Sequence, residues 1–475
     1  MTLAQRFARF AANLELDTIP APALDKARAC VLNGYGIALG SHPTPFFGVA
    51  ERAVLAMDGE REDGATLLGS GRRSTVAGAA LANAALFHGR AQEDTCGVAH
   101  FGAILLPLLT ALVERGEGRI EDFLPALVAG YEVGGALEAA YSPLTTAAGL
   151  RASPLYGAVA AAAAAARLWR LPEGRHSTAT GMDRSPPGCM PAPAISHRTA
   201  AALANAASFA GGILQSFGDG TDEWRYQVGM AGRNGLAAAT LAASGSVSAA
   251  GAFEGRSGFV RAFVRTECDV DAIAGQLGKD WSILKVTFKP YPVCALNQTP
   301  VRASLALREQ LGAQADAVRA VRIHLNPTVV GYAGMDKEGP FESVSGTLMS
   351  IQFCVATTLL HGAPTIAHMT AFDDAGVLGL IPRIRPLADP ALGLLSCRIE
   401  ADVDGRAEPV VVQMHTDHTE YSYDRAGVSA LVRRIGAETG VAPSAYDHIE
   451  KFAQALPHAD LGDVLAAFGT IQTAR

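Results

Sequence analysis

The densest group of reactive side chains in the chain lies between residues 88 and 100. The stretch 86–107 reads LFHGRAQEDTCGVAHFGAILLP, and it stands between runs of alanine and aliphatic residues. Polar groups are buried only where each finds a partner, so such a cluster between apolar helices indicates a cavity or a solvent-facing turn. Within it, Asp94, Thr95 and His100 could bind or react with a ligand. His100 precedes a glycine and an apolar run, which predicts a turn at a helix N-terminus, where carboxylates bind well. The alternative is a histidine with a structural role only.

Three other stretches place reactive groups beside predicted helices or prolines. Arg151 comes directly before a long alanine-rich run, so its guanidinium is expected at a helix start, although an arginine there is also typical of a solvated surface. Arg225 belongs to the polar segment 219–227, which leads into an apolar helix. Lys289 stands in FKPYP between aromatic and proline residues, and Tyr332 follows it later in the chain.

Composition and charge limit the possible partners. The chain has 475 residues, of which 49% are apolar and 18% charged, as is typical of a soluble globular protein. The net charge of −7, without long runs of like charge, argues against nucleic acid and against an anionic membrane surface as partners. A small anionic substrate would therefore need a local basic pocket.

The cysteines are odd in number, scattered, and without a C-x-x-C pair. This pattern predicts a reducing compartment, the cytoplasm, and argues against a disulfide framework. It also argues against a zinc or iron–sulfur site of ordinary spacing, so no metal and no cofactor are expected. The seven are Cys30, Cys96, Cys189, Cys268, Cys294, Cys354 and Cys397.

Helical periodicity must position most of these groups. It predicts two helices within 4–39, and others at 76–88 and 120–141. The alanine-rich runs 153–171 and 199–216 contain too little Leu or Ile for membrane spans and are predicted to be buried helices. The segment 172–197, with five prolines, is predicted to be an inserted surface loop, with an error in the sequence as the alternative.

The hydrophobic pattern changes after residue 281, from helical periodicity to a mixture of strands and helices. Alternation predicts a strand over 317–325 and a hairpin formed by 395–403 and 410–414, with helices 299–311 and 345–360 covering one face of a small sheet. Helical periodicity returns at 428–438, 444–456 and 461–468. The prediction is a mainly α fold. Its large all-α helical domain has two parts, 1–268 and 416–475, and a smaller α+β lid domain, 269–415, is inserted between them.

Several motifs, in order over some 270 residues, resemble the MmgE/PrpD family, which includes 2-methylcitrate dehydratase, cis-aconitate decarboxylase and iminodisuccinate epimerase. The resemblance implies the same discontinuous layout and a homodimer, which glycine-rich apolar helix faces also favour. The motifs are residues 83–88 (NAALFH), 93–95 (EDT) with His100, 129–132 (AGYE), 157–168, 229–235 (GMAGRNG) and 289–294 (KPYPVC).

The family chemistry asks for particular parts. Loss of water from a hydroxy-polycarboxylate, or of CO₂ from an unsaturated one, requires cations that bind the carboxylates and an acid–base pair that moves a proton. Lys289, Arg225 and Arg151 could bind carboxylates, while His100, Tyr332 and Lys289 could move protons. We therefore expect His100 and Lys289 to converge on one cationic cleft between the two parts of the molecule.

The chain departs from the family pattern at four positions. Ala91 replaces an Asp four residues before the Thr, and Arg151 replaces the histidine of a Gly-Phe-His-Pro motif. Trp224 and Gln227 replace a Lys and a His before the helix glycine. These replacements leave the reaction open between a lyase acting on a polycarboxylate and two alternatives. One is a two-base epimerase using Lys289 with His100 or a tyrosine such as Tyr141. The other is a dimeric scaffold whose site has decayed.

Overall fold

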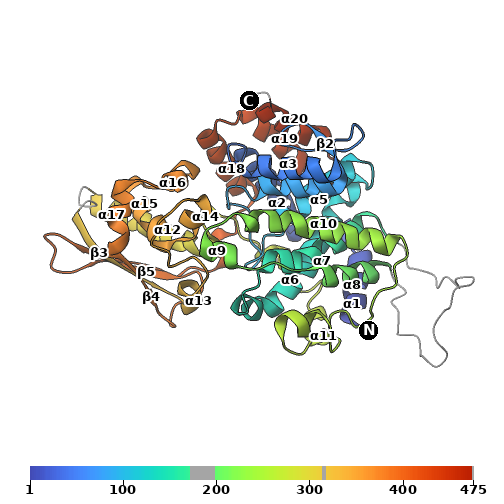
Figure 1. Ribbon diagram of the computed structural model, residues 1–475, viewed down its shortest axis with the longest axis horizontal. Helices are drawn as coiled ribbons and strands as arrows, with labels where there is room; N and C mark the ends of the chain where they lie inside the picture. Colours follow the sequence, from blue (N-terminus) through green and yellow to red (C-terminus); the bar gives the residue numbers. More distant parts are fainter. Residues whose placement is uncertain (172–197, 313–316, 473–475) are drawn as a thin grey trace, which may run out of the picture.

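The computed structural model describes residues 1–171, 198–312 and 317–472, so the predicted loop 172–197 lies outside the described residues. Figure 1 shows a large helical block beside a smaller part that contains a sheet. The predicted mainly α fold with a small α+β part is confirmed. None of the described helices is both long enough and apolar enough to cross a membrane.

The helical block is built from both ends of the chain. Its hydrophobic core takes residues from 3–288 and again from 428–471, and the C-terminal helices α18 and α19 pack on α2. The longer helices of the first part are α1 (Leu3–Ala12), α2 (Ala21–Gly40), α3 (Phe46–Asp58), α4 (Val76–Phe87), α5 (Gly102–Glu114), α6 (Phe123–Ala147), α7 (Ala152–Leu168), α8 (Arg198–Phe209) and α10 (Glu223–Ala243). The C-terminal helices are α18 (Arg425–Thr439), α19 (Pro443–Ala455) and α20 (Leu461–Gln472). Shorter elements are α9 (Gln215–Asp219), α11 (Val270–Ala274) and the strand pair β1 (Ala65–Thr66) and β2 (Arg73–Ser74).

The alanine-rich helix α7 forms the centre of this block. Every residue of α7 is buried, between α6, α8 and α10. Small side chains allow the helices to approach closely: a Cβ atom added to Gly235 of α10 would lie 2.4 Å from the Cβ of Ala161 and 2.7 Å from the carbonyl oxygen of Ala158. The prediction of buried rather than membrane-spanning helices therefore agrees with the packing of α7 and α8.

The smaller part contains a four-stranded sheet in the order β4-β3-β5-β6. Strand β3 (Val318–Leu325) pairs antiparallel with β5 (Cys397–Val403) and parallel with β4 (Ile384–Ala388), while β5 and β6 (Val410–Met414) form the predicted hairpin. Val318, Val321 and Ile323 are buried, as predicted. Val321 and Ile323 follow the alternation of a strand, whereas Val318 lies three residues before Val321 and comes before a register shift at Ala320. Helices α12 (Gln298–Leu311) and α15 (Ile351–His361) cover the sheet, as Figure 1 shows. The other helices are α13 (Pro327–Val330), α14 (Val344–Met349), α16 (Ile366–Thr370) and α17 (Ala375–Leu380).

Two details differ from the sequence prediction. The predicted helix 345–360 is divided into α14 and α15 at Ser350, which has an extended backbone and whose side chain accepts a hydrogen bond from the Phe353 N–H. Strand β4 was not predicted, because its short segment has little alternation.

The second hydrophobic core includes Ala91, Leu214, Phe217 and Trp224 from the helical block, and these residues mark the junction between the two parts.

Candidate active site

The loop between α4 and α5, residues 88–101, is fastened to the segment that carries Lys289. Thr95 and Thr287 exchange two backbone hydrogen bonds, each of 2.9 Å, between N–H and carbonyl groups. The Val98 N–H donates to the carboxylate of Glu138 in α6, at 2.9 Å. Because Lys289 follows Thr287 by two residues, this pairing brings a lysine distant in the sequence against the 88–101 loop.

A buried carboxylate, Glu93, joins the reactive groups. Its Oε1 accepts a hydrogen bond from Lys289 Nζ at 2.5 Å and lies 3.3 Å from His100 Nδ1, while Oε2 lies 3.1 Å from His88 Nδ1. Burial alone would raise the pKa of Glu93, but His88, Lys289 and His100 outweigh it and hold that pKa well below its usual range. Glu93 is therefore an ionised carboxylate enclosed by cationic and N–H groups.

The partners of the two histidines assign the nitrogen that carries each proton. Arg151 can only donate, and its Nη2 lies 2.7 Å from His88 Nε2, so that nitrogen accepts and Nδ1 carries hydrogen toward Glu93. Burial lowers the pKa of His88 to about 4, which agrees with a neutral ring. His100 Nδ1 lies 3.0 Å from the backbone oxygen of Asp94, so it too carries hydrogen and leaves Nε2 as the basic nitrogen.

Arg151 stands at the start of α7, as predicted, and is held over aromatic rings. It is 3% exposed and donates to the Trp224 carbonyl oxygen and, at 3.3 Å, to Gln227 Oε1. Its guanidinium carbon lies 5.3 Å from the ring centroid of Phe217 and 5.5 Å from that of Trp224. Burial lowers the pKa of Arg151 to about 10, so the guanidinium remains charged at neutral pH.

A cavity of about 40 Å³ lies where these groups meet. Tyr332, which follows α13, closes one side, and its ring centroid lies 6.2 Å from that of Phe217. Burial raises the pKa of Tyr332, so its phenol is protonated at neutral pH. The cavity is lined by Ala91, Glu93, Val98, His100, Arg151, Phe217, Trp224, Lys289, Cys294, Ala295, Leu296, Tyr332, Leu348 and Met349.

Four of the seven site residues predicted from the sequence meet in this cavity. His100 and Lys289 contact the same carboxylate, and Arg151 and Tyr332 lie on the same lining. His100 and Lys289 thus lie 189 residues apart in the sequence and meet at one carboxylate, while residues up to Phe288 still belong to the core of the helical block. The arrangement combines a neutral imidazole, an ammonium, a guanidinium and a phenol, and such a set can bind carboxylates and transfer protons.

The other three predicted residues are buried beside the cavity and do not line it. The carboxylate of Asp94 accepts a hydrogen bond from the Tyr131 hydroxyl in the helical core. Thr95 is used in the backbone pairing with Thr287. Arg225 donates to Asp222 Oδ1 at 3.1 Å, and its guanidinium carbon lies 4.0 Å from the Trp224 ring centroid. Thr95 lines the adjoining cleft of about 560 Å³, and its hydroxyl, like Nε and Nη2 of Arg225, has no hydrogen-bond partner among the described residues.

Sequence reasoning overlooked Glu93, His88 and Trp224 as members of the site. Glu93 and His88 belong to the polar cluster between residues 88 and 100, but their residue types alone do not separate them from Arg90 or Asp94. Trp224 was noted only as a departure from a family pattern. The structure places its ring centroid 4.6 Å from that of His88, and its Nε1 donates to Ser345 Oγ at 2.9 Å.

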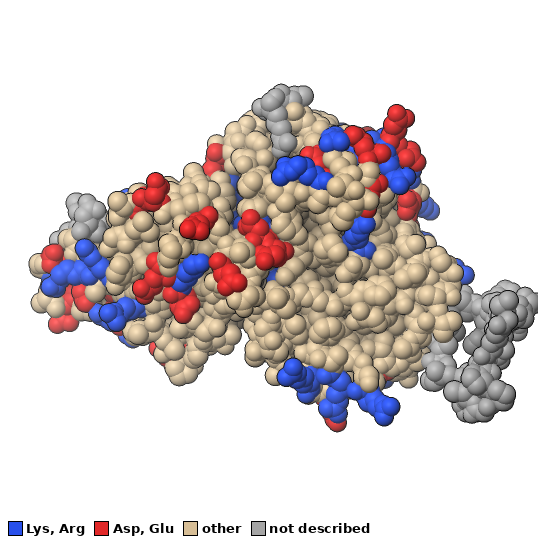
Figure 2. Space-filling model, in the orientation of Figure 1, with Lys and Arg blue, Asp and Glu red and all other residues tan. Residues whose placement is uncertain are grey.

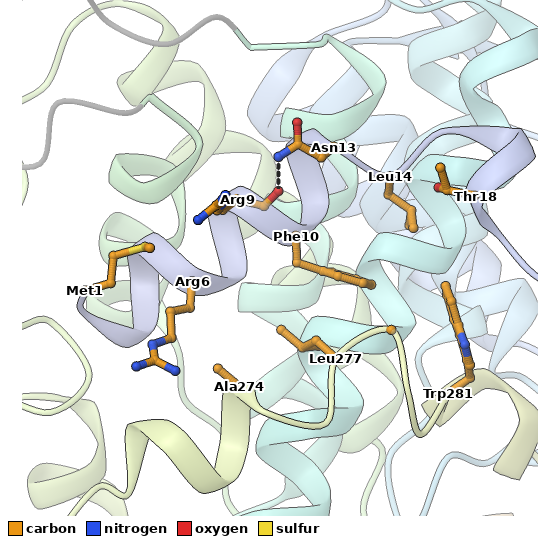
Figure 3. Close-up of a pocket in the computed structure, with 11 residues that line it drawn as sticks. Met1, Arg6, Arg9, Phe10, Asn13, Leu14, Thr18, Ala274, Leu277 and Trp281 are labelled. Atoms are coloured by element: carbon orange, nitrogen blue, oxygen red, sulfur yellow. Dashed lines mark hydrogen bonds between the residues drawn. The ribbon is translucent and has the colours of Figure 1, made fainter.

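A separate surface pocket of about 530 Å³ lies between α1 and the segment 274–281. Figure 3 shows Phe10, Leu277 and Trp281 in this pocket, with Arg6 and Arg9 on its α1 side. Its lining contains no His, Cys, Asp or Glu, so it offers no side chain suited to proton transfer near neutral pH. Among residues 1–171, 198–312 and 317–472, no group of three His, Cys, Asp or Glu side chains is arranged to hold a metal ion.

Comparison with known proteins shows the family of the chain. The chain is 27% identical over 388 residues to a cis-aconitate decarboxylase of Aspergillus terreus, covering 77% of this chain and 73% of that protein. It is 26% identical over 395 residues to a cis-aconitate decarboxylase-like protein of Aspergillus oryzae, covering 78% and 76%. The MmgE/PrpD N-terminal domain matches residues 5–188 and 195–269, and the MmgE/PrpD C-terminal domain matches 291–426. Because these two matches take in most of the sequence, including the loop that carries Glu93, the chain belongs to the MmgE/PrpD family.

Proposed function

We propose that this protein is a lyase that acts without a cofactor on a small polycarboxylate, such as 2-methylcitrate or cis-aconitate, and removes water or CO₂. The observation that carries the proposal is the contact of His100 and Lys289 with one buried carboxylate, Glu93, in a cavity that Arg151 also lines. The relatives named cis-aconitate decarboxylase support the class of reaction.

The proposed chemistry uses His100 as the base. Its Nε2 takes the proton from the carbon next to a carboxylate, and the C–H electron pair forms the new C=C bond. The hydroxyl leaves as water after receiving a proton from Lys289 or Tyr332. In the decarboxylation, the C–C bond to one carboxylate breaks, CO₂ leaves, and the carbon that keeps the electron pair takes a proton from the same donors. Arg151 binds a carboxylate in either reaction and stabilises the charge that develops there.

A substrate panel tests the proposal. The purified protein is incubated with citrate, 2-methylcitrate and cis-aconitate, and products are followed by mass and by ultraviolet absorbance of the alkene. The variants His100→Ala and Lys289→Ala are expected to lower kcat/KM by roughly 10²–10⁴-fold. The controls His458→Ala and Lys279→Ala, at exposed positions, should keep the wild-type rate. Wild-type rates in both cavity variants would remove these residues from the mechanism.

Two other functions remain as outcomes of the same experiments. An epimerase would exchange one proton at a stereocentre, so it would incorporate deuterium into recovered substrate in D₂O without releasing water or CO₂. Tyr141, considered as a second base for that reaction, does not line the cavity, and its hydroxyl is buried without a partner. A wild-type protein that turns over nothing in the panel would favour a scaffold with a decayed site.

We also propose that the protein is a homodimer that associates through the exposed face of α8 and α10. Figure 2 shows a broad surface with few charged residues in the region of α8 and α10, bordered by charged side chains. Glu223 and Arg233 of α10 are charged. Large apolar side chains are exposed there, and monomeric proteins seldom expose many of them together. They are Phe209, Ile213, Met230, Leu241 and Val247, with Val247 86% exposed.

Sedimentation velocity tests the dimer. The double variant Met230→Asp/Leu241→Asp should sediment as a monomer, because a carboxylate buried at an interface without a partner is unfavourable. Met57→Asp, at a 59% exposed position on α3, is the matched control and should remain a dimer. A wild-type monomer would reject the proposal.

The location we propose is the cytoplasm, since the cysteines within the described residues are free thiols.

A further inference from the structure

The cavity offers cations to two carboxylates and no more. Among the residues that line it, Lys289 and Arg151 are cations and Glu93 is a carboxylate, so the lining carries one net positive charge. His100 adds no charge near neutral pH, because burial and the nearby Lys289 hold its pKa well below the usual value.

Both cations keep N–H donors that are free to bind a carboxylate. An ammonium has three N–H donors and a guanidinium has five. Glu93 takes one donor from Lys289, while Trp224, Gln227 and the ring of His88 engage the two terminal nitrogens of Arg151. We assign one substrate carboxylate to each cation. A third carboxylate in this cavity would have no cation of its own, which is unfavourable for a buried charge.

The rest of the lining is apolar. Phe217, Trp224, Leu348 and Met349 form its wall, and all four belong to the hydrophobic core that joins the two parts of the molecule. Two of the four departures from the family pattern make the lining more apolar, since Ala91 and Trp224 are apolar residues. A third, Gln227, is uncharged and binds Arg151. The cavity thus provides more contact for hydrocarbon than for charge.

The cavity shares part of its lining with a cleft that carries no charged side chain. At about 40 Å³ the cavity has room for only a few water molecules. Val98, Leu296 and Tyr332 line both this cavity and an adjoining cleft of about 520 Å³, beside the end of α6. The cleft lining contains no Lys, Arg, Asp, Glu or His, and it includes Pro143, Thr146, Ala147, Thr328 and Leu394. A second neighbouring cleft, of about 560 Å³, shares Val98, Lys289, Ala295 and Leu296 with the cavity. It also carries the charged groups Glu138, Lys285 and Asp417, so it suits an apolar chain less well.

We propose that the substrate carries at most two carboxylates, bound by Arg151 and Lys289, and an uncharged apolar arm that passes between Val98, Leu296 and Tyr332 into the charge-free cleft. The inference rests on the proposed lyase function and narrows its substrate class to dicarboxylates, in place of the tricarboxylates 2-methylcitrate and cis-aconitate. A 2-alkylmalate has this form, since it is citrate with one carboxymethyl group replaced by an alkyl chain. Its dehydration breaks one C–H and one C–O bond, forms one C=C bond and releases water, so no oxidant or reductant is required.

Kinetics on a homologous series test the proposal. The purified protein is assayed with 2-methyl-, 2-propyl- and 2-hexylmalate beside citrate and 2-methylcitrate. We expect kcat/KM to rise at least about tenfold from the methyl to the hexyl compound, because each buried methylene favours binding. The hexyl compound should also exceed 2-methylcitrate by about tenfold or more. A flat or falling series, or a preference for the tricarboxylates, would overturn the inference and leave the lyase function standing.

Calorimetry separates the failure of this inference from the failure of the proposed function. Binding of 2-hexylmaleate is compared with binding of cis-aconitate, which has the same dicarboxylate core and a third carboxylate in place of the alkyl arm. Binding of 2-hexylmaleate at least about tenfold tighter, without turnover of any compound, would reject the lyase and support the ligand class. Equal or tighter binding of cis-aconitate, or no binding of either compound, would reject the ligand class.

A pair of variants on α6 locates the arm. Thr146 lines the charge-free cleft, so Thr146→Trp should shorten that cleft and lower kcat/KM for 2-hexylmalate at least fivefold more than for 2-methylmalate, an effect of about 1 kcal/mol. Leu144→Trp is the control, because Leu144 is 50% exposed on the same helix and lies outside the cleft lining. An equal effect of Thr146→Trp on both compounds would place the arm elsewhere and overturn this part of the proposal.

Discussion

The substitution Asp94→Asn should change how the stability of the protein depends on pH. Asp94 is 2% exposed, and its carboxylate accepts a hydrogen bond from Tyr131. Burial raises the pKa of Asp94 to about 6, although that hydrogen bond opposes the shift. Its ordinary value is 3.8, which an unfolded chain should retain. Between these two values the folded protein binds a proton that the unfolded chain has lost.

The sign and the size of the effect follow from this difference. Where the folded state holds more protons, the free energy of unfolding falls as the pH rises. Wild type therefore loses about 3 kcal/mol between pH 3.8 and 6 through Asp94, since each pH unit of difference corresponds to about 1.4 kcal/mol. Asparagine keeps an oxygen that can accept from Tyr131 and has no such titration. Relative to wild type, the variant should gain about 3 kcal/mol on going from pH 4 to pH 7.

Urea unfolding of both proteins, followed by tryptophan fluorescence between pH 4 and pH 7.5, measures this gain. Taking the difference between the two proteins at each pH removes the contribution of the other titrating groups. A difference that does not vary with pH would show that the pKa of Asp94 is not raised, and would refute its burial in contact with Tyr131.

The same variant examines whether Asp94 touches the substrate. Because its carboxylate does not line the cavity, Asp94→Asn should alter KM by less than about threefold, below 1 kcal/mol. Steady-state kinetics on any substrate of the panel give this value. A tenfold or larger rise in KM, with kcat unchanged, would return Asp94 to the substrate-binding role that sequence reasoning gave it.

Three further substitutions act on buried contacts. Glu93→Gln leaves Lys289 buried without a carboxylate, so it should cost about 3 kcal/mol of stability and lower kcat by roughly 10²-fold; thermal melts and turnover measure both, and unchanged values would contradict the ion pair. Burial lowers the pKa of His88 from 6.5 to about 4, so wild type should lose about 3 kcal/mol as the pH falls between these values. His88→Gln should abolish that loss in acid-unfolding curves, and a parallel curve would count against a neutral ring. Gly235→Ala should cost about 2 kcal/mol through contact with the α7 backbone, whereas Gly379→Ala, with nothing within 4 Å, should be neutral in the same melts.

Much of the fold could be predicted because its local signals agree with its packing. The alternation of Val321 and Ile323 matches the buried side of β3. The alanine run 153–171 matches α7, and the run 199–216 matches α8 as far as Phe209. The domain boundaries at 268 and 415 stay a prediction, although the two hydrophobic cores divide the chain in a similar way. The parallel pairing of β4 with β3 could not be predicted from local patterns, because it joins segments some sixty residues apart.

The candidate site shows a sharper limit of sequence reasoning. Glu93 and Asp94 are adjacent carboxylates in the same loop, and residue type gives no reason to prefer one over the other. The structure separates them: Glu93 contacts Lys289 in the cavity, whereas Asp94 contacts Tyr131 in the helical core. Their pKa values shift in opposite directions for the same reason, since Glu93 is surrounded by cationic and N–H groups and Asp94 is not. Which of two neighbouring acids faces a substrate depends on backbone direction within a loop, and only the pairing of that loop with Thr287 determines it.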